Sequence, residues 1–274
     1  GEETPGRSSN GIFRSPAKPN ESPRSMASCG GNLAGRFAAS NHPLSKRVKV
    51  TIQGFIITLD RAVERRPQVD RLRQLCPVRC EAIQAVDGRL LSEAQRREVV
   101  RECIHRPRYP FRLRDGEVGI FLSHRKAWSE IVAQDLEAGL ILEDDVELEP
   151  NVFRPGLDLA LSDLKPMDVI KFPVSRANWF ASRRKARPRS RAPIVTPLGA
   201  TSLLVGHAAA KRLLELTERF DRPIDTFMQM TWITGIRPRV ITPSGVTEIS
   251  SRLGGSTIHA KKRPLLETLS RSVL

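Results

Sequence analysis

Long apolar runs are missing from the sequence of 274 residues. The longest, such as Phe55 to Ile57 and Leu140 to Leu142, fall far short of the ~18 to 20 apolar residues that cross a bilayer as a helix. The start, GEETPGRSSN, also lacks the basic-then-apolar order of a secretory signal. The sequence therefore predicts no transmembrane helix and a cytoplasmic protein.

Cysteine is scarce as well. The four cysteines, Cys29, Cys76, Cys80 and Cys103, are too few and too scattered for a disulfide framework, which agrees with a reducing compartment. Cys76 and Cys80 have CxxxC spacing, but no second Cys or His pair at ligand spacing accompanies them. Ordinary thiols are therefore favoured over a structural zinc site.

Aromatic residues make up only 5% of the chain, although its formal net charge is +15. Such a charge attracts phosphates, whether in nucleic acid, in anionic lipid or in a nucleotide substrate. The few aromatic side chains leave little surface on which bases could stack, and zinc-finger and RNP-like patterns are missing. A basic nucleic-acid-binding protein is therefore an alternative and not the favoured function.

Part of the charge is concentrated in one segment that Pro188 interrupts. Its basic residues are Arg183, Arg184, Lys185, Arg187, Arg189 and Arg191. This composition is typical of an exposed loop. A further hypothesis is that the segment makes peripheral contact with the inner face of an anionic membrane, where each basic residue contributes ~1 kcal/mol.

Composition divides the chain into three parts. Residues 1–46 are rich in Ser, Pro, Gly and Asn and predict a disordered tail, because they cannot bury enough surface to offset the entropy of ordering. Residues 47–260 predict one domain, and 261–274 a basic C-terminal tail. The domain suits the length and hydrophobic content of a single α/β fold.

Strands and helices alternate along 47–260, which favours α/β architecture with a mostly parallel central sheet. The expected strands are 48–59, 78–86, 140–142, 167–172 and 200–205. The expected helices are one capped by Asp60 that covers 63–75, one that begins at Ser92, and 117–139, 151–164, 207–217 and 225–234.

Three adjacent carboxylates, Glu143, Asp144 and Asp145, follow the short buried strand 140–142. Ligands of α/β sheets bind at the carboxyl ends of the strands. Like charges repel and are costly to bury, so a cation is expected there, and Mg²⁺ or Mn²⁺ suits hard oxygen ligands. The alternatives are a solvated turn or a helix N-cap before Pro150.

Longer motifs give these carboxylates a context. Gly116 to His124, Trp128 and the run Leu140 to Val146 resemble glycosyltransferase family 25, which includes lipooligosaccharide-type sugar transferases. The match extends over roughly 50–258. It includes Ile57 to Arg61, Glu64 to Arg66, Ala85 to Gly88, Ala209 to Leu214 and Pro223 to Asp225.

The resemblance implies a single Rossmann-like domain of GT-A type. It also implies a UDP-sugar donor, often UDP-galactose, a divalent metal, and transfer with inversion to a glycan or lipid-linked saccharide such as a lipopolysaccharide precursor. The acidic cluster would be the counterpart of a DxD motif. Glu143 and Asp145 would contact the metal, and Asp144, which can point the other way along the strand, has a less defined catalytic role.

The resemblance also assigns residues to the donor. Those near the first strand are Thr58, Leu59 and Arg65, the turn residues are Asp87 and Gly88, and the helix residues are Glu117, Ser123 and His124. A solvated arginine, a plain turn and a core histidine are the ordinary alternatives.

Asp225 is the candidate general base that takes the proton of the acceptor hydroxyl, and a helix cap for 226–233 is its alternative. His259 is a candidate further metal ligand. A relative that keeps the fold and has lost catalysis is also an alternative, which the intact acidic cluster disfavours.

Overall fold

A computed structural model of the chain describes residues 51–174 and 187–253. All of these residues belong to one compact unit. The tails predicted at 1–46 and 261–274, the basic residues Arg183 to Lys185, and His259 all lie outside the described residues.

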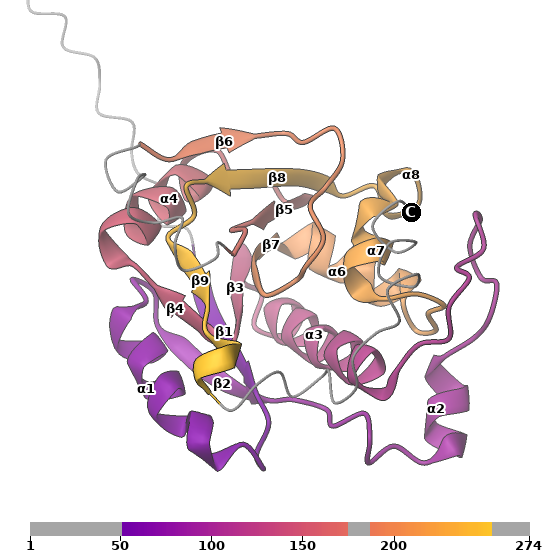
Figure 1. The fold of residues 1–274 in the computed structure, drawn as a ribbon. Coiled ribbons are helices and arrows are strands. Elements are labelled where there is room, and N and C mark those ends of the chain that lie inside the picture. The colour runs from indigo at the N-terminus through magenta and orange to yellow at the C-terminus, as the bar shows by residue number, and fades with distance from the viewer. Residues whose placement is uncertain (1–50, 175–186, 254–274) are drawn as a thin grey trace, which may run out of the picture. The chain divides into compact units, whose positions relative to one another are not determined.

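A central sheet forms the middle layer of this unit (Figure 1). Within the described residues it has seven strands in the order β2-β1-β3-β7-β5-β8-β6. Their bounds are β1 Ile52–Thr58, β2 Cys80–Gln84, β3 Ala138–Glu143, β5 Asp168–Lys171, β6 Arg189–Arg191, β7 Ser202–Gly206 and β8 Arg237–Thr242. All run in one direction except β7 and β6, so the prediction of a mostly parallel α/β sheet is confirmed.

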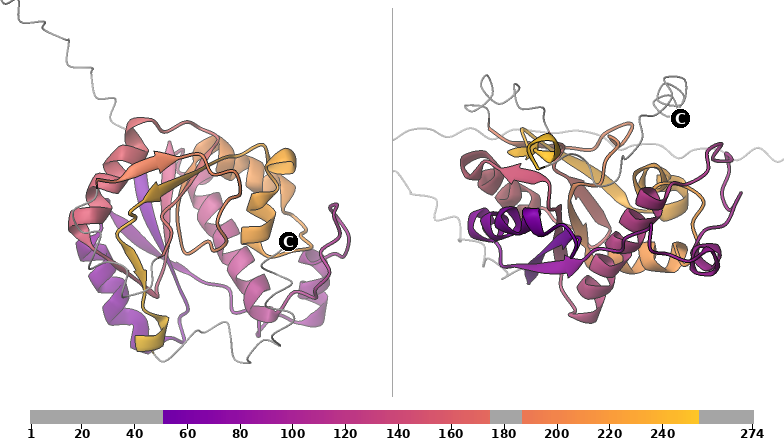
Figure 2. Two further views of the ribbon diagram at one scale, coloured as in Figure 1. Left: turned by 45° about the horizontal axis from the view of Figure 1, so that its top comes forward. Right: turned by 60° about the horizontal axis from the view of Figure 1, so that its bottom comes forward.

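Helices cover both faces of the sheet (Figures 1 and 2). The helices are α1 Arg66–Leu75, α2 Glu93–Val99, α3 Asp115–Ala133, α4 Pro150–Ser162, α6 His207–Leu216, α7 Ile224–Gln229 and α8 Thr231–Thr234, with the 3-10 turns η1 Val63–Arg65 and η3 Ser250–Arg252. A small second sheet pairs β4 (Val146–Leu148) with β9 (Val246–Glu248).

Two hydrophobic clusters lie on opposite faces of the sheet. Ile141 packs with α3, whereas its neighbours Leu140 and Leu142 pack with α1 and α4. Successive side chains of a strand point to opposite faces, so β3 contributes to both clusters, and five of its six residues are buried. The strand that carries the acidic cluster is thus fixed on both sides.

Local sequence signals predict some helix boundaries correctly and others wrongly. Ser92 forms the predicted capping box: its Oγ accepts from the backbone N of Gln95 at 3.2 Å, and its own N donates to Gln95 Oε1 at 2.9 Å. The prediction that Asp60 caps the next helix is wrong. Arg65 occupies the cap position of α1, and the Asp60 carboxylate accepts from Gln84 Nε2.

Two helices are shorter than predicted. The one expected to reach Gly139 ends at Ala133, because 138–143 forms β3. The one expected over 225–234 is divided into α7 and α8 at Met230. No helix among the described residues is both long enough and apolar enough to cross a membrane.

Candidate active site

The acidic cluster lies at the carboxyl end of β3, as predicted. The backbone N of Glu143 donates to Thr201 O at 2.9 Å, and that of Asp144 to Ile57 O at 3.2 Å. The carbonyl of Asp145 accepts from the backbone N of Ile249 at 2.8 Å. Backbone groups next to β7, at the end of β1 and beyond β9 therefore hold the three residues in place.

Asp144 is committed to contacts within the protein. One carboxylate oxygen accepts from Thr58 Oγ1 at 2.8 Å, and the other contacts the Arg65 guanidinium. Arg65 also lies 3.8 Å from Asp145 Oδ2 and is only 2% exposed. The alternative of a solvated helix arginine is therefore wrong, because Arg65 is a buried counter-ion of the cluster.

Glu143 and Asp145 are less well compensated. Burial, and then the neighbouring carboxylate charges, raise the pKa of each to about 7. Asp145 Oδ1 is buried and has no hydrogen-bond partner among the described residues. Arg65 thus contacts Asp144 closely and Asp145 at a longer distance, and within the described residues Asp145 Oδ1 is left without a hydrogen bond.

These two carboxylates suit a divalent cation only in part. Among the described residues no three His, Cys, Asp or Glu side chains are grouped as a complete metal site. Mg²⁺ and similar ions commonly bind one or two carboxylates and take their other ligands from water and substrate phosphates. Asp145 Oδ1, which has no hydrogen-bond partner among the described residues, is compatible with that kind of site, and metal binding by Glu143 and Asp145 stays a prediction.

His124 lies beside the cluster. Its Nε2 is 3.8 Å from Glu143 Oε1, and the ring is fully buried in α3. Burial, and then the charge of Lys171, lower the pKa of His124 to about 3, so the imidazole is neutral. Neither ring nitrogen has a hydrogen-bond partner among the described residues, and contact of His124 with a donor stays a prediction.

Lys171 is a residue that the sequence motifs did not indicate. It ends β5, is 3% exposed, and donates to Gly199 O at 2.7 Å and to Pro197 O. Burial lowers its pKa to about 8, an effect that the charge of Asp225 opposes. A lysine is rarely buried without partners. The position of Lys171 within an apolar strand was therefore the one signal in the sequence that could have indicated a buried, paired lysine.

Asp225 lies in the first turn of α7, whose cap position is Pro223. The alternative role of Asp225, as the cap of a helix over 226–233, is therefore wrong. Its carboxylate accepts from the backbone N of Gly199 at 3.1 Å and from that of Thr226 at 2.8 Å. Its charge contributes to the raised pKa of Glu143 and opposes the lowering at Lys171, so it belongs to the same electrostatic environment.

The predicted donor turn is packed against the start of α3. A β-carbon on Gly88 would lie 1.8 Å from Asp115 O, and one on Gly119 would lie 2.5 Å from Val86 O, so glycine is required at both positions. Arg89 at 3.2 Å, and then Arg61 at 2.5 Å, hold the Asp87 carboxylate and lower its pKa to about 2.

Ser123 and Glu117 have structural contacts in this region. Ser123 Oγ accepts from the backbone N of Val86 at 2.8 Å and donates to Gly119 O at 2.6 Å. Glu117 Oε2 accepts from the backbone N of Arg114 at 2.8 Å, at the start of α3. Leu59 O accepts from the backbone N of Ala62 at 2.9 Å in the turn after β1. Contact of these residues with a donor stays a prediction.

The chain belongs to a family of sugar-transferring enzymes. Residues 51–228 match the profile described as glycosyltransferase family 25 (LPS biosynthesis protein). This match covers more than half of the chain, so the chain is a member of glycosyltransferase family 25, as its motifs indicated. The matched range contains the acidic cluster, Arg65, His124, Lys171 and Asp225.

Individual relatives are similar over shorter stretches. Human procollagen galactosyltransferase 2 is 35% identical over 98 residues, which is 35% of this chain and 16% of that protein. A glycosyltransferase 25 family member of Drosophila melanogaster is 37% identical over 99 residues, 35% of this chain and 16% of that protein. The human inactive glycosyltransferase 25 family member 3 is 33% identical over 137 residues, 47% of this chain and 23% of that protein.

Solved structures superpose weakly. A crystal structure of a glycosyltransferase involved in the glycosylation of the major capsid of PBCV-1 gives a TM-score of 0.31 at 10% identity, over 60% of this chain and 63% of that one. A TM-score at this level does not establish a common fold. The GT-A type assigned from the motifs therefore depends on the family match and on the α/β sheet described above.

Proposed function

We propose that the protein is a glycosyltransferase that transfers a hexose from a UDP-sugar to a glycan or lipid-linked saccharide with inversion. The observation that carries this proposal is that the three carboxylates of the acidic cluster differ in their contacts. Asp144 is fixed by Arg65 and Thr58, whereas Asp145 has a buried oxygen without a hydrogen-bond partner in the part of the chain that the structure describes, and the Glu143 side chain is 16% exposed.

Glu143 and Asp145 would hold a Mn²⁺ or Mg²⁺ ion together with the donor diphosphate. When bound, such an ion stabilises the negative charge that develops on the departing nucleotide. Arg65 would hold the Asp144 carboxylate and keep the strand end rigid, so that the other two carboxylates stay correctly placed. The turn residues Thr58, Leu59, Asp87 and Gly88 would lie along the nucleotide.

Inversion requires one displacement at the anomeric carbon, with a base that accepts the proton of the attacking hydroxyl. Asp225 would be that base. Its carboxylate is oriented by the backbone N of Gly199, and Lys171 fixes the same residue through its carbonyl. The Asp225 and Lys171 side chains thus meet at the backbone of Gly199, which gives Asp225 a defined position.

Galactose is the first donor sugar to test, because a matched relative is named as a procollagen galactosyltransferase. A glycan or lipid-linked saccharide acceptor, and a role in lipopolysaccharide biosynthesis, are also parts of the proposal. A cytoplasmic location with peripheral membrane contact stays a prediction.

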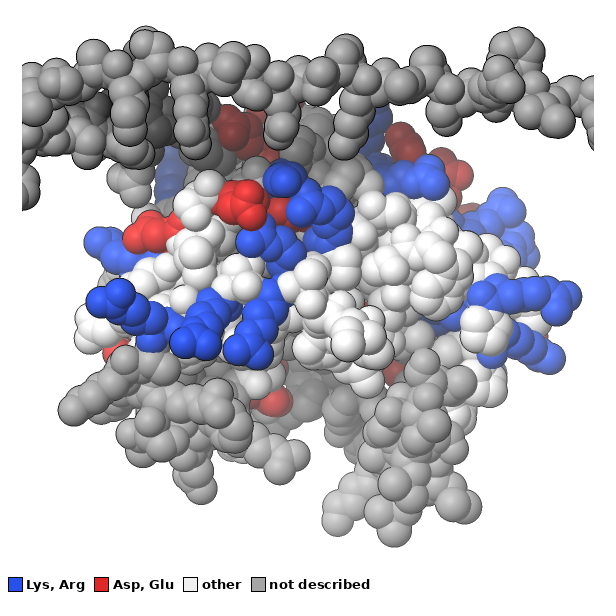
Figure 3. Space-filling view, turned by 90° about the horizontal axis from the view of Figure 1, so that it is seen from above, with Lys and Arg blue, Asp and Glu red and all other residues white. Residues whose placement is uncertain are grey.

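Two alternatives remain testable. Some matched relatives are named inactive. The first alternative is therefore a family member that keeps the fold and has no catalytic activity. A basic nucleic-acid-binding protein is the second alternative. Figure 3 shows many Lys and Arg side chains on the face seen from above, and β6 contributes the exposed residues Arg189 and Arg191.

UDP release from a panel of UDP-hexoses, with a mixture of neutral disaccharide acceptors and Mn²⁺, tests the proposal. We expect release from one donor, and at least a hundredfold slower release by Asp225→Asn at unchanged donor KM. Asp158→Asn, on the exposed side of α4, is the matched control and should behave as wild type. Salt-sensitive binding of RNA or DNA without UDP release from any donor would favour the second alternative.

A further inference from the structure

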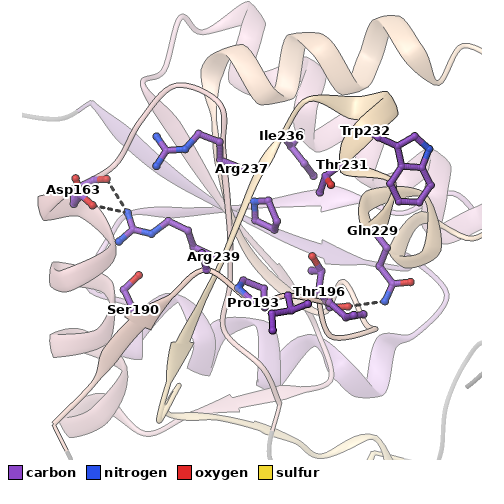
Figure 4. Close-up of a pocket in the computed structure, with 14 residues that line it drawn as sticks. Asp163, Ser190, Pro193, Thr196, Gln229, Thr231, Trp232, Ile236, Arg237 and Arg239 are labelled. Carbon is purple, nitrogen blue, oxygen red and sulfur yellow. Dashed lines mark hydrogen bonds and ion pairs between the residues drawn. The ribbon is translucent and has the colours of Figure 1, made fainter. Parts of the chain in front are cut away.

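A pocket of about 870 Å³ lies outside the acidic cluster (Figure 4). It is formed by β6 and the segment that follows it, by the start of β8, by α7 and α8, and by the residue that follows α4. The lining residues that matter here are Asp163, Ser190, Thr196, Trp232, Arg237 and Arg239. Figure 4 shows an elongated site in which Asp163 and the two arginines lie toward one end and Trp232 toward the other.

The aromatic end offers a flat exposed surface. Trp232 is 67% exposed, although large aromatic side chains are usually buried. The neighbouring rim residues Ile194 and Val195 are exposed as well. An indole ring combines an apolar face with a polar N–H, and a sugar ring likewise has an apolar C–H face and a hydroxylated edge. Trp232 is therefore suited to stack against a sugar.

The arginines that line the polar end are paired within the protein. Arg239 lies 3.0 Å from Asp163 and 3.6 Å from the buried Asp168, and Arg237 lies 3.6 Å from Asp168. Arg237 and Arg239 are thus balanced by two aspartates, so neither is an unpaired cation that would select a phosphate. The same groups can donate to and accept from hydroxyls.

Ser190 adds an independent observation. It lies between Arg189 and Arg191 on β6, and its Oγ is buried with no hydrogen-bond partner among the described residues. A buried hydroxyl without a partner costs ~1 to 3 kcal/mol, so such groups normally find one. A hydroxylated ligand in the pocket would supply that partner.

The pocket adjoins the candidate base. The carbonyl of Thr196, in the pocket wall, accepts from Gln229 Nε2 at 2.6 Å, and the backbone N of Gly199 donates to Asp225 at 3.1 Å. The segment 196–199 therefore runs along α7 from one end to the other. Four residues of helix rise ~6 Å, and three peptide steps span at most ~11 Å, which is the scale of a disaccharide.

We propose that this pocket binds an uncharged saccharide, namely the sugar units of the acceptor that lie beyond the hydroxyl to be glycosylated. The saccharide stacks on Trp232. One end extends toward Ser190 and Arg237, and the reactive end leaves the pocket beside Gln229 and follows the segment 196–199 to Asp225. The role as acceptor site rests on the proposed transferase function. The binding of a neutral sugar chain does not, and it can be measured separately.

The test has two arms on the full chain. The first is saturation-transfer NMR with a panel of neutral disaccharides, namely lactose, maltose, cellobiose and chitobiose, each at concentrations up to ~10 mM, which detects Kd values in the millimolar range. We expect one of them to bind to wild type and at least tenfold more weakly to Trp232→Ala and Arg237→Met. Arg212→Met, an exposed arginine of α6, is the matched control and should bind as wild type does.

The second arm measures steady-state transfer to the disaccharide that binds. Trp232→Ala should raise the acceptor KM at least tenfold and leave the donor KM unchanged. Loss of UDP release in every variant, wild type included, while Trp232-dependent binding persists would refute the transferase function alone. Three results would overturn the saccharide site. One is transfer with an acceptor KM that neither substitution changes, and another is no binding of any disaccharide. The third is binding of glucose 6-phosphate as tight as that of the neutral disaccharide.

Discussion

The buried pair of Arg65 and Asp144 gives the sharpest stability prediction. Its side chains are 2% and 8% exposed, and Arg65 also lies 3.8 Å from Asp145. Replacement of Arg65 by Met keeps much of the side-chain volume and removes the positive charge. The three carboxylates of the cluster would then share a buried site without that cation.

Removal of one partner of a buried ion pair typically costs ~3 to 5 kcal/mol, because the other charge is left uncompensated. We expect Arg65→Met to lower the free energy of unfolding by about that amount in metal-free buffer. The pKa values of Glu143 and Asp145 should rise further, because Arg65 is the group that lowers them. Protonation of these carboxylates limits the loss at low pH, so it should be larger at pH 8 than at pH 5.

Urea denaturation monitored by circular dichroism measures the change, provided that the m-value stays constant. Arg71→Met is the matched control. Arg71 pairs with Glu147 at 3.1 Å, but its side chain is 58% exposed, and an exposed pair contributes only ~0 to 1 kcal/mol. Similar losses of under ~1 kcal/mol in both variants would show that the acidic cluster is solvated, contrary to our account.

Three further perturbations follow from other contacts. Gly88→Ala should lower the melting temperature strongly in differential scanning calorimetry, because a β-carbon there would lie 1.8 Å from Asp115 O, and an unchanged transition would contradict this packing. Ser92→Ala should cost ~1 kcal/mol in urea denaturation through loss of the capping box, whereas no loss would mean that α2 does not depend on it. The pKa of Lys171 is lowered to about 8, so between pH 8 and 10.5 the unfolded chain binds more protons and stability rises with pH. The urea midpoint of wild type minus that of Lys171→Met should therefore rise between pH 8 and 10.5. A difference that does not change with pH would mean that Lys171 is solvated.

Much of the fold could be predicted because it depends on local patterns. The alternation of apolar strands and amphipathic helices indicated the α/β class, and the Ser92 and Gln95 pair indicated the start of α2. The reversed direction of β7, between β3 and β5, has no local signature, because strand pairing depends on contacts between distant parts of the chain.

The candidate site divides in the same way. The acidic cluster was found from its place after a buried strand. Lys171 and the burial of Arg65 were not, because each depends on a partner far away in sequence: Gly199 for Lys171, and Asp144 for Arg65. Asp60 shows the opposite error. Its side chain is well suited to cap a helix, but it accepts a hydrogen bond from Gln84 of the neighbouring strand instead.

The most direct test of the central claim is calorimetric titration of the full chain with UDP-galactose and other UDP-hexoses, with and without Mn²⁺. Wild type and Asp158→Asn should bind one donor only with the metal. Asp145→Asn should bind it at least tenfold more weakly, because the amide has no negative charge for the metal. Equal donor affinity in Asp145→Asn and wild type, or no binding of any UDP-sugar by wild type with Mn²⁺, would contradict the assignment of the acidic cluster as the donor site.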